Sequence, residues 1–433
     1  MLLEFSVTNF LSFKETVTLT MVASSISELR ETHVFDAGNK INLLTSSAVY
    51  GANASGKSNL FKALMFMKWF IRTSSKDTQI GENIDVEPFK LSTLTESQPS
   101  GFEMLFVKDN IVYRYGFEVD SKRVHREWLY YIPKTKEINL FNRTGDEFEL
   151  NRHFPEGIEW TDKTRENALF LSVVAQWKGE ISTKVVEWFS NGLSVSSGLR
   201  SHYRESIEML EIKNFKREFL SFIQAADLGI VDMGIEKKQI DFSELPDSLR
   251  MLIRDGKDAL GEVQQVDIQM IHPKFDEHNK FDSFQKFSLA TQESEGTRKI
   301  FSILGPVLDG IRSGKTVVID ELDSNLHPIL TQALIDCFNS DEANPKHAQL
   351  IFNTHDTNLL SYRRLRRDQI WFCEKDRYGA SHLYSLVDYS PNKKVRKDEA
   401  YEKNYLMGKY GAIPYIGQFN LNSLEEVGDK TGE

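Results

Sequence analysis

A short glycine-rich motif near the start of the chain constrains its fold more than any other feature. Residues 51–58 read Gly-Ala-Asn-Ala-Ser-Gly-Lys-Ser and match the pattern G-x-x-x-x-G-K-[ST] at every defined position. An apolar run over residues 47–50 precedes the motif, and apolar side chains recur at helical spacing over residues 59–71. This order of strand, glycine loop and helix predicts a loop that surrounds a phosphate group with backbone N–H donors at a helix N-terminus.

The chemistry of the motif assigns a separate task to each of its members. The glycines let consecutive N–H groups turn inward, the ammonium group of Lys57 reaches the β and γ phosphates of a nucleotide, and the hydroxyl of Ser58 is a ligand for Mg²⁺. The alternative is a glycine turn that contains Gly-Lys-Ser by chance, and the flanking strand and helix argue against it. The candidate nucleotide contacts are Gly51, Asn53, Ala54, Ser55, Gly56, Lys57, Ser58 and Asn59.

Two later apolar runs end in polar side chains that suit the same chemistry. Residues 316–319 lead into Asp320 and Glu321, where the first carboxylate can hold Mg²⁺ and the second can act as a general base toward water. Strands often end in acidic residues, so this pair gains its weight from the phosphate loop upstream. Residues 349–353 lead to His355, which can hydrogen-bond a γ phosphate, although a lone histidine is more often structural.

A fourth motif precedes an amphipathic helix over residues 299–311. It consists of Ser294, Glu295, Gly296 and Thr297, and a serine with a glycine at a helix start forms an anion site. Taken alone, an ordinary helix N-cap explains this motif better. A second anion site would be redundant within one chain, which fits a loop that closes over the nucleotide of a partner subunit.

The order of these four motifs resembles that of the ABC-type ATPase heads of the SMC, RecF and OLD class. Residues 323–327, Asp-Ser-Asn-Leu-His, directly follow the acidic pair, as in that class. Within the class, the chain is similar to the compact AAA-named ATPases of bacterial phage-defence operons, such as the PARIS, Septu and abortive-infection systems. The further segments that carry this likeness are residues 5–13, 87–91, 165–171, 294–297 and 405–414.

The resemblance implies ATP and Mg²⁺ as ligands and a role for each motif. Residues 51–58 would be the Walker A loop, Asp320 with Glu321 would be the Walker B pair, and His355 would be the switch histidine. The expected catalytic residues are Glu321, Lys57 and His355; the expected metal ligands are Ser58 and Asp320; the signature loop acting in trans is Ser294, Glu295, Gly296 and Thr297; and the D-loop is Asp323, Ser324 and Asn325. Two departures are Leu11, where many relatives carry an arginine, and a signature that reads Ser-Glu-Gly-Thr rather than Ser-Gly-Gly-Gln. The sequence assigns no Q-loop glutamine.

Composition and patterning place these motifs in an α/β protein. The chain has 433 residues, 40% of them hydrophobic, and a formal charge of −10, which is typical of a soluble globular protein. It has no long apolar run, and Cys337 and Cys373 are its only cysteines, so we expect a cytoplasmic protein with two buried thiols.

We expect a P-loop NTPase head of the ABC type, with an N-terminal antiparallel β-hairpin region and a parallel core, split by a β-rich and helical insertion. The expected parts are residues 1–75 (core with Walker A), 76–285 (insertion, with strands over 101–150 and helices over 165–225), 286–375 (core with signature, Walker B, D-loop and histidine) and 376–433 (C-terminal cap).

The resemblance further implies an ATPase sensor or scaffold in antiphage defence. Such a protein would control an effector encoded nearby, with a toxin nuclease as the expected class, and would form a homodimer or higher homo-oligomer with ATP at the interfaces. We expect no Toprim-type metal cluster in this chain. The alternative is a DNA-repair or DNA-maintenance ATPase of the SMC or RecF type that clamps DNA itself. Basic runs at residues 363–367 and 393–397 leave nucleic acid open as a partner, although most such runs are solvated faces. A membrane transporter subunit is disfavoured by the long β insertion.

Overall fold

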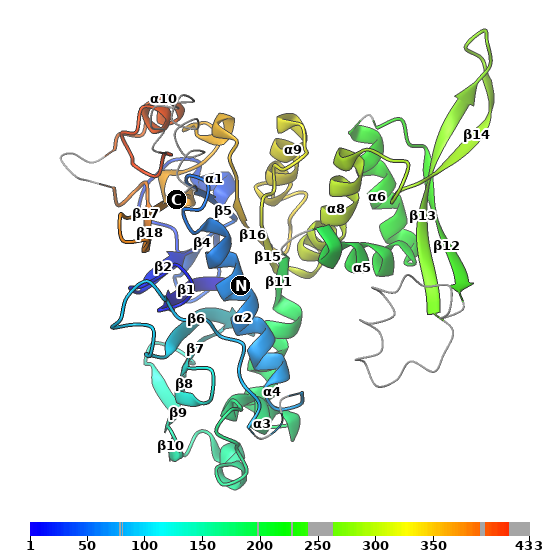
Figure 1. The fold of residues 1–433 in the computed structure, drawn as a ribbon. Helices are drawn as coiled ribbons and strands as arrows, with labels where there is room; N and C mark the ends of the chain where they lie inside the picture. Colours follow the sequence, from blue (N-terminus) through cyan, green and yellow to red (C-terminus); the bar gives the residue numbers. More distant parts are fainter. Residues whose placement is uncertain are drawn as a thin grey trace, which may run out of the picture.

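The computed structural model describes residues 1–77, 79, 81–196, 199–226, 228–240, 263–389 and 395–414. Figure 1 shows two large β-sheets on one side of the molecule, a group of helices beside them, and a β-sheet arm that projects on the far side of those helices. The N-terminus lies beside the sheets (Figure 1).

The first sheet is antiparallel and has seven strands in the order β10-β9-β8-β7-β6-β1-β2. Its N-terminal hairpin pairs Val7 with Val17, and a bridge between Phe10 and Phe13 closes the turn, which confirms the predicted hairpin. The strands are β1 (Leu2–Thr8), β2 (Val17–Thr20), β6 (Ser100–Lys108), β7 (Ile111–Val119), β8 (Val124–Ile132), β9 (Ile138–Thr144) and β10 (Glu147–Leu150). The strands predicted over residues 101–150 therefore extend the N-terminal hairpin rather than form a sheet of their own.

The second sheet has six strands in the order β11-β15-β16-β5-β17-β18, and its first five strands are parallel. They are β11 (Leu193–Ser196), β15 (Thr316–Ile319), β16 (Gln349–Asn353), β5 (Ser46–Tyr50), β17 (Ile370–Lys375) and the antiparallel edge strand β18 (Ser381–Ser385). Every residue of β5, β15 and β16 is buried, as expected for parallel strands that are covered on both faces.

Alternate side chains of this core sheet enter two separate hydrophobic clusters. Val49 joins the cluster that contains α2 (Lys57–Thr73) and the antiparallel sheet, whereas Ala48 and Tyr50 join the cluster on the opposite face. The opposite face is covered by α8 (Glu295–Ser313), α9 (Pro328–Phe338) and α10 (Tyr401–Leu406). The period-two alternation of the strands thus explains the layered arrangement.

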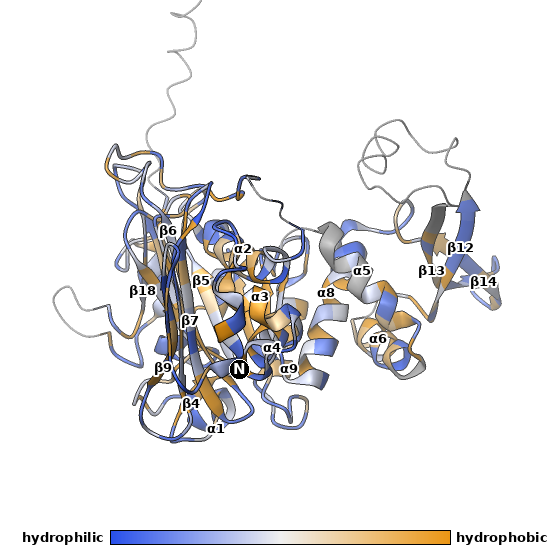
Figure 2. Ribbon diagram, turned by 90° about the horizontal axis from the view of Figure 1, so that it is seen from below, coloured by the Kyte–Doolittle hydropathy of each residue, from blue (hydrophilic) through white to orange (hydrophobic). Residues whose placement is uncertain are grey.

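The remaining elements surround these layers. The hydrophobic cluster around α2 includes α3 (Phe170–Gln176), α4 (Glu180–Glu187) and the π-helical turn η2 (Trp188–Gly192), while α5 (Leu199–Leu210) and α6 (Lys213–Ala225) pack against α8. The projecting arm consists of β12 (Asp232–Ile240), β13 (Val263–Phe275) and β14 (Phe281–Ser288), and Figure 2 shows it farthest from the core sheets. A small helix and hairpin, α1 (Arg30–His33), β3 (Val34–Asp36) and β4 (Asn42–Leu44), complete the N-terminal part.

The predicted fold class is confirmed: the protein is mixed α/β, with an antiparallel N-terminal region and a parallel core around the strand–loop–helix unit of a P-loop NTPase. Two details differ from the prediction. The region predicted to be helical contributes β11 to the core sheet, and Cys337 is half-buried, whereas Cys373 is buried as expected.

The four-part division of the chain stays a proposal, and residues 393–394 and 415–433 lie outside the described residues. Within the described part, no helix combines the length and apolarity needed to cross a membrane.

Candidate nucleotide-binding site

The phosphate loop connects β5 to α2 and passes very close to neighbouring strands. Gly51 has φ +156°, and a Cβ atom there would lie 2.2 Å from the carbonyl oxygen of Cys373. Gly56 has φ +112°, and a Cβ atom there would lie 2.3 Å from Oγ of Ser381. Any side chain at either position would displace backbone or a buried hydroxyl, so the two glycines of the motif are required by the packing as well as by the turn.

Hydrogen bonds from neighbouring hydroxyl groups hold the phosphate loop in place. Ser381 donates to the carbonyl oxygen of Ser55 at 2.6 Å, and its Oγ lies 2.8 Å from Oγ of Ser12. Asn59 donates from Nδ2 to the same Ser12 hydroxyl at 2.8 Å. The N-terminal turn and β18 therefore hold the loop together, and Ser12 belongs to the segment that the sequence analysis matched only by resemblance.

Lys57 is almost fully enclosed by the loop that it follows. Its side chain donates from Nζ to the carbonyl oxygens of Gly51 at 2.7 Å and Ala52 at 2.9 Å, and the residue is 6% exposed. Burial lowers the pKa of Lys57 from its ordinary value, and the nearby Cys373 and Asp320 partly oppose this shift. An ammonium held at the centre of a phosphate loop is positioned to exchange these carbonyl contacts for phosphate oxygens.

The two predicted metal ligands lie within hydrogen-bonding distance of each other, although they are 262 positions apart in the chain. Ser58 donates from Oγ to Oδ1 of Asp320 at 3.1 Å, and Asn353 donates to the same carboxylate oxygen. A hydroxyl and a carboxylate are the oxygen donors that Mg²⁺ prefers, with the remaining positions left to phosphate and water. Ser55 adds a buried hydroxyl that has no hydrogen-bond partner in the described structure, and this orphaned group sits inside the phosphate loop. The residues present thus fit a nucleotide with Mg²⁺.

Glu321 has a backbone that is fixed on both sides. Its φ is +54°, its N–H donates to Oδ1 of Asn353, and its carbonyl oxygen accepts a hydrogen bond from Nζ of Lys299 at 2.9 Å. A glutamate in the left-handed region is strained, so these two contacts stabilise an otherwise unfavourable turn. The side chain of Glu321 itself is exposed.

Lys299 is a site residue that the sequence analysis did not assign. It lies on α8 and is 5% exposed, and burial lowers its pKa while Glu321, Asp323 and Asp320 oppose that shift. The available signal was a lysine next to the apolar residues 300 and 301 of an amphipathic helix, which places a cation on a buried face. Lys299 thus connects α8, which begins at the signature motif, to the acidic turn formed by Asp320 and Glu321.

The predicted D-loop, histidine and signature are close to one another within one chain. Asp323 accepts a hydrogen bond at Oδ2 from the backbone N–H of His355 at 3.1 Å. His355 is exposed as a residue, but its ring is partly withdrawn from water, and this desolvation together with the positive charge of Lys57 lowers its pKa, which favours the neutral ring. At the start of α8, a Cβ atom on Gly296 would lie 3.0 Å from the carbonyl oxygen of Asn325.

Ser294 is the N-cap of α8. Its Oγ accepts a hydrogen bond from the backbone N–H of Thr297 at 3.1 Å, and both Ser294 and Glu295 are exposed. This capping geometry is what an ordinary helix start requires. The exposure of the motif leaves its predicted role toward a second subunit as a proposal.

A cavity of about 680 Å³ lies over the phosphate loop. Residues 51–55 and His355 form part of its wall, and the end of β17 with the C-terminal segment forms the rest. The lining residues that the sequence analysis did not assign are Cys373, Glu374, Lys375, Tyr405, Ala412, Ile413 and Pro414. The C-terminal residues among them belong to the segment 405–414, which the sequence analysis had noted only for its likeness to relatives.

Comparison with known protein families gives a match over most of the chain. Residues 46–361 match the family described as "AAA domain, putative AbiEii toxin, Type IV TA system". The chain belongs to this family. The matched span of the AAA domain family contains every site residue predicted from the sequence, from Gly51 to His355, and leaves out the segment 405–414.

Other comparisons add little. A solved structure, the SMC head bound to the C-winged helix domain of ScpA, is 12% identical to this chain, with 89% of this chain and 97% of that chain covered and a TM-score of 0.35. No curated protein matches the sequence.

Proposed function

We propose that this AAA domain family member is an ABC-type ATPase that binds ATP with Mg²⁺ and hydrolyses it slowly. The hydrogen bond between Ser58 and Asp320 carries the proposal, because it joins two motifs from distant parts of the chain into one metal-binding position. The buried ammonium of Lys57 and the orphaned hydroxyl of Ser55 lie in the same loop. Each of these features has a use when a triphosphate is bound.

The residues of the site divide the work of phosphoryl transfer. Backbone N–H groups of the loop and Lys57 would hold the phosphates, while Ser58 and Asp320 would hold Mg²⁺, which supplies positive charge against the triphosphate. Glu321 would take the proton of the attacking water, and its fixed backbone would aim the carboxylate. His355, favoured in its neutral form, would hydrogen-bond the γ phosphate.

Release of phosphate from ATP by the purified protein tests this proposal. We expect slow release that needs Mg²⁺ and stops when EDTA is added, and Asp320→Asn should lose most of it because a neutral amide is a poor Mg²⁺ ligand. Unchanged hydrolysis by Asp320→Asn would contradict the assignment of the metal site.

We infer that the C-terminal side of the cavity receives the base of the nucleotide. Ile413, Pro414 and Ala412 give that side an apolar wall opposite the polar phosphate loop. An Ile413→Ala variant should weaken ATP binding several-fold and leave binding of inorganic pyrophosphate unchanged. Equal loss of both ligands would mean that Ile413 supports the loop rather than the base.

The proposal extends to a homodimer or higher homo-oligomer with ATP at the interfaces. Ser294, Glu295, Glu321 and His355 are all exposed in the single chain, although the proposed chemistry needs water to be excluded around the γ phosphate. A second copy that presents its signature loop would cover this open side.

The biological role that we propose is a sensor or scaffold in antiphage defence that controls a separately encoded effector, with a toxin nuclease as the expected class. Support for a separate effector comes from the likeness seen in the sequence, while the family description names a putative toxin of a Type IV TA system. Purification of the tagged protein from its native operon tests the role. A neighbouring gene product should co-purify, and its absence at stoichiometric levels would count against effector control.

The alternative, a DNA-clamping ATPase of repair or maintenance, gains no support from the arginine run at residues 363–367. Arg366 is fully buried and bonds Asp368, and Arg367 is paired with Glu28. Half of the four arginines in this run are therefore structural. Strong, salt-sensitive and ATP-dependent binding of DNA by the isolated protein would still favour this alternative.

A further inference from the structure

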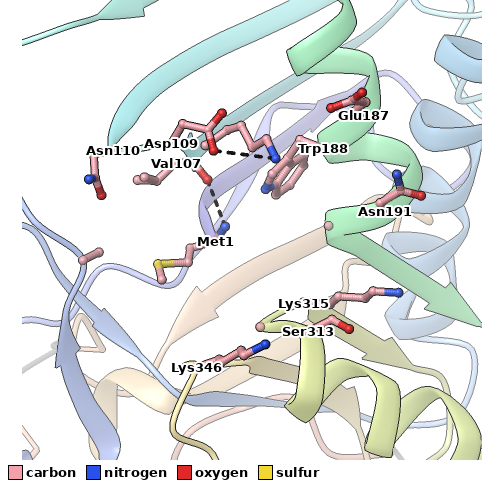
Figure 3. A pocket seen from close by; sticks show the side chains of 14 residues that line it. Met1, Val107, Asp109, Asn110, Glu187, Trp188, Asn191, Ser313, Lys315 and Lys346 are labelled. Carbon is pink, nitrogen blue, oxygen red and sulfur yellow. Dashed lines mark hydrogen bonds and ion pairs between the residues drawn. The ribbon is translucent and has the colours of Figure 1, made fainter.

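A second cavity of about 650 Å³ lies at the opposite end of the core sheet from the phosphate loop. Gly192 and Lys315 line it and directly precede the parallel strands β11 and β15, and Lys346 lines it shortly before β16. The turn after β6, at Asp109 and Asn110, closes it from the antiparallel sheet. Figure 3 shows these side chains around one shared opening.

One wall of this cavity holds a buried donor without an acceptor. Trp188 is 3% exposed, and its indole Nε1 makes no hydrogen bond within the described structure. An indole N–H can only donate, and a buried donor left unpaired destabilises the fold. Phe106 stacks on the indole with a centroid distance of 4.1 Å, so the ring is held in place. A ligand in the cavity that brings an acceptor would satisfy this group.

Three lysines line the same cavity and add further donors. Lys346 is exposed and has no ion pair or hydrogen bond among the described residues. Lys315 pairs with Asp309, which does not line the cavity, and Lys108 lies 3.7 Å from Asp109, too far for a close hydrogen bond. Because an ammonium has three donors, all of these groups can still donate to a ligand.

Two glycines give the cavity its shape. A Cβ atom on Gly192 would lie 2.9 Å from the ring of Trp188, and a Cβ atom on Gly314 would lie 2.9 Å from the carbonyl oxygen of Lys346, at a φ of +69°. Side chains at these positions would push the indole and Lys346 out of place. The volume falls in the range of about 300–1,000 Å³ that small-molecule sites occupy.

We propose that this cavity binds a small phosphorylated ligand, a nucleotide or a sugar phosphate, through Lys346, Lys315 and the indole N–H of Trp188. Lys346 and the indole N–H of Trp188 are donors without a partner among the described residues, which acceptor oxygens of a ligand would satisfy, and a phosphate dianion matches several ammonium groups better than a single carboxylate does. The carboxylates of Asp109 and Glu187, which also line the cavity, can accept hydrogen bonds from the hydroxyl groups of a sugar. This site is separate from the phosphate loop, because Lys315 directly precedes β15 and Asp320 directly follows it at the opposite end of the strand.

Isothermal titration calorimetry on a Lys57→Ala background tests the proposal, since that change removes the phosphate loop as a competing site. The probes are ADP, ribose 5-phosphate and inorganic phosphate, each titrated into the full chain. We expect saturable binding with one site per chain for ADP or ribose 5-phosphate, and the two probes distinguish a nucleotide from a sugar phosphate.

Three further variants on that background locate the site. Lys346→Ala should weaken binding at least tenfold, and Trp188→Phe, which keeps the ring and removes only the N–H, should also weaken it. Lys280→Ala, at an exposed lysine of the distant arm, is the matched control and should change nothing. The proposal is overturned if none of the three probes binds, if only inorganic phosphate binds, or if Lys346→Ala binds as tightly as its parent. A probe that binds the unaltered protein but not the Lys57→Ala variant binds at the phosphate loop alone.

Discussion

At the scale of single residues, two lysines determine how the acidic turn and the phosphate loop work together. Lys57 sits inside the loop, and Lys299 holds the carbonyl of Glu321 from the side of α8. Both are buried and both have a lowered pKa, and the same acidic residues oppose that shift in each case. A bound triphosphate with its metal would act on this shared cluster of charges.

Replacing Lys57 with alanine should remove most of the affinity for ATP. The variant loses a charge-assisted contact to phosphate, which is worth up to about 3 kcal/mol, so we expect a roughly 100-fold rise in the dissociation constant. Equilibrium binding of a fluorescent ATP analogue measures this directly. Retained affinity would show that the loop does not hold the phosphates.

Replacing Lys299 with methionine should slow hydrolysis without weakening ATP binding. Methionine preserves the length and helix propensity of the side chain but cannot donate to the carbonyl of Glu321, so the left-handed turn loses one of its two supports. We expect kcat to fall about tenfold with little change in KM, as for a positioning residue. Lys299→Arg keeps a donor and should recover part of the rate. A rise in KM with kcat unchanged would contradict this role.

At the scale of elements, a buried ion pair fastens α3 to the antiparallel sheet. Glu127 on β8 and Arg143 on β9 are each about 1% exposed, with Nη1 and Oε2 3.7 Å apart. Glu127 also accepts hydrogen bonds from the backbone N–H groups of Phe170 at 2.7 Å and Leu171 at 2.9 Å, at the start of α3. One carboxylate therefore joins two strands and a helix.

Removing this carboxylate should destabilise the fold more than any surface change of the same kind. Glu127→Ala leaves Arg143 buried without its partner, which costs about 3–5 kcal/mol. Urea denaturation followed by circular dichroism measures the loss. The control is Glu180→Ala, which breaks the exposed pair of Glu180 with Lys184 and should leave the midpoint unchanged. Similar midpoints for the two variants would refute the structural role of Glu127.

The helices and strands also show which parts of the fold could be predicted from the sequence. Strong local signals, such as the alternation over residues 2–20 and the glycine motif, predicted the hairpin and the strand–loop–helix unit. The strand β11 was missed because it has only four residues, follows a helical region, and is stabilised by pairing with β15 far along the chain. Long-range pairing likewise joins β1 to β6 and merges the predicted insertion with the N-terminal sheet. Lys299 and Ile413 were missed because only the folded chain brings them near the motifs.

At the scale of the whole molecule, the open side of the site argues for a partner copy. The groups expected to act on the γ phosphate, Glu321 and His355, are exposed, and so is the signature loop that begins at Ser294. An ATPase that completes its site by self-association would hydrolyse only in the closed assembly and would open after phosphate release. Association would then depend on ATP, and a variant that cannot hydrolyse should accumulate as the closed form.

Glu321→Gln should be such a variant. The contacts that fix the turn, to Asn353 and Lys299, are made by the backbone of Glu321, so the substitution keeps the geometry and removes only the base. We expect the molar mass from sedimentation equilibrium to be that of the monomer without nucleotide and at least double with ATP and Mg²⁺. Adding Lys57→Ala to the same variant should abolish this increase. Without the Lys57 ammonium, the negative charge of a triphosphate buried between the subunits is left without this partner, so the closed form should not assemble. The same molar mass for Glu321→Gln with and without ATP would show that the open side is not completed by a second copy.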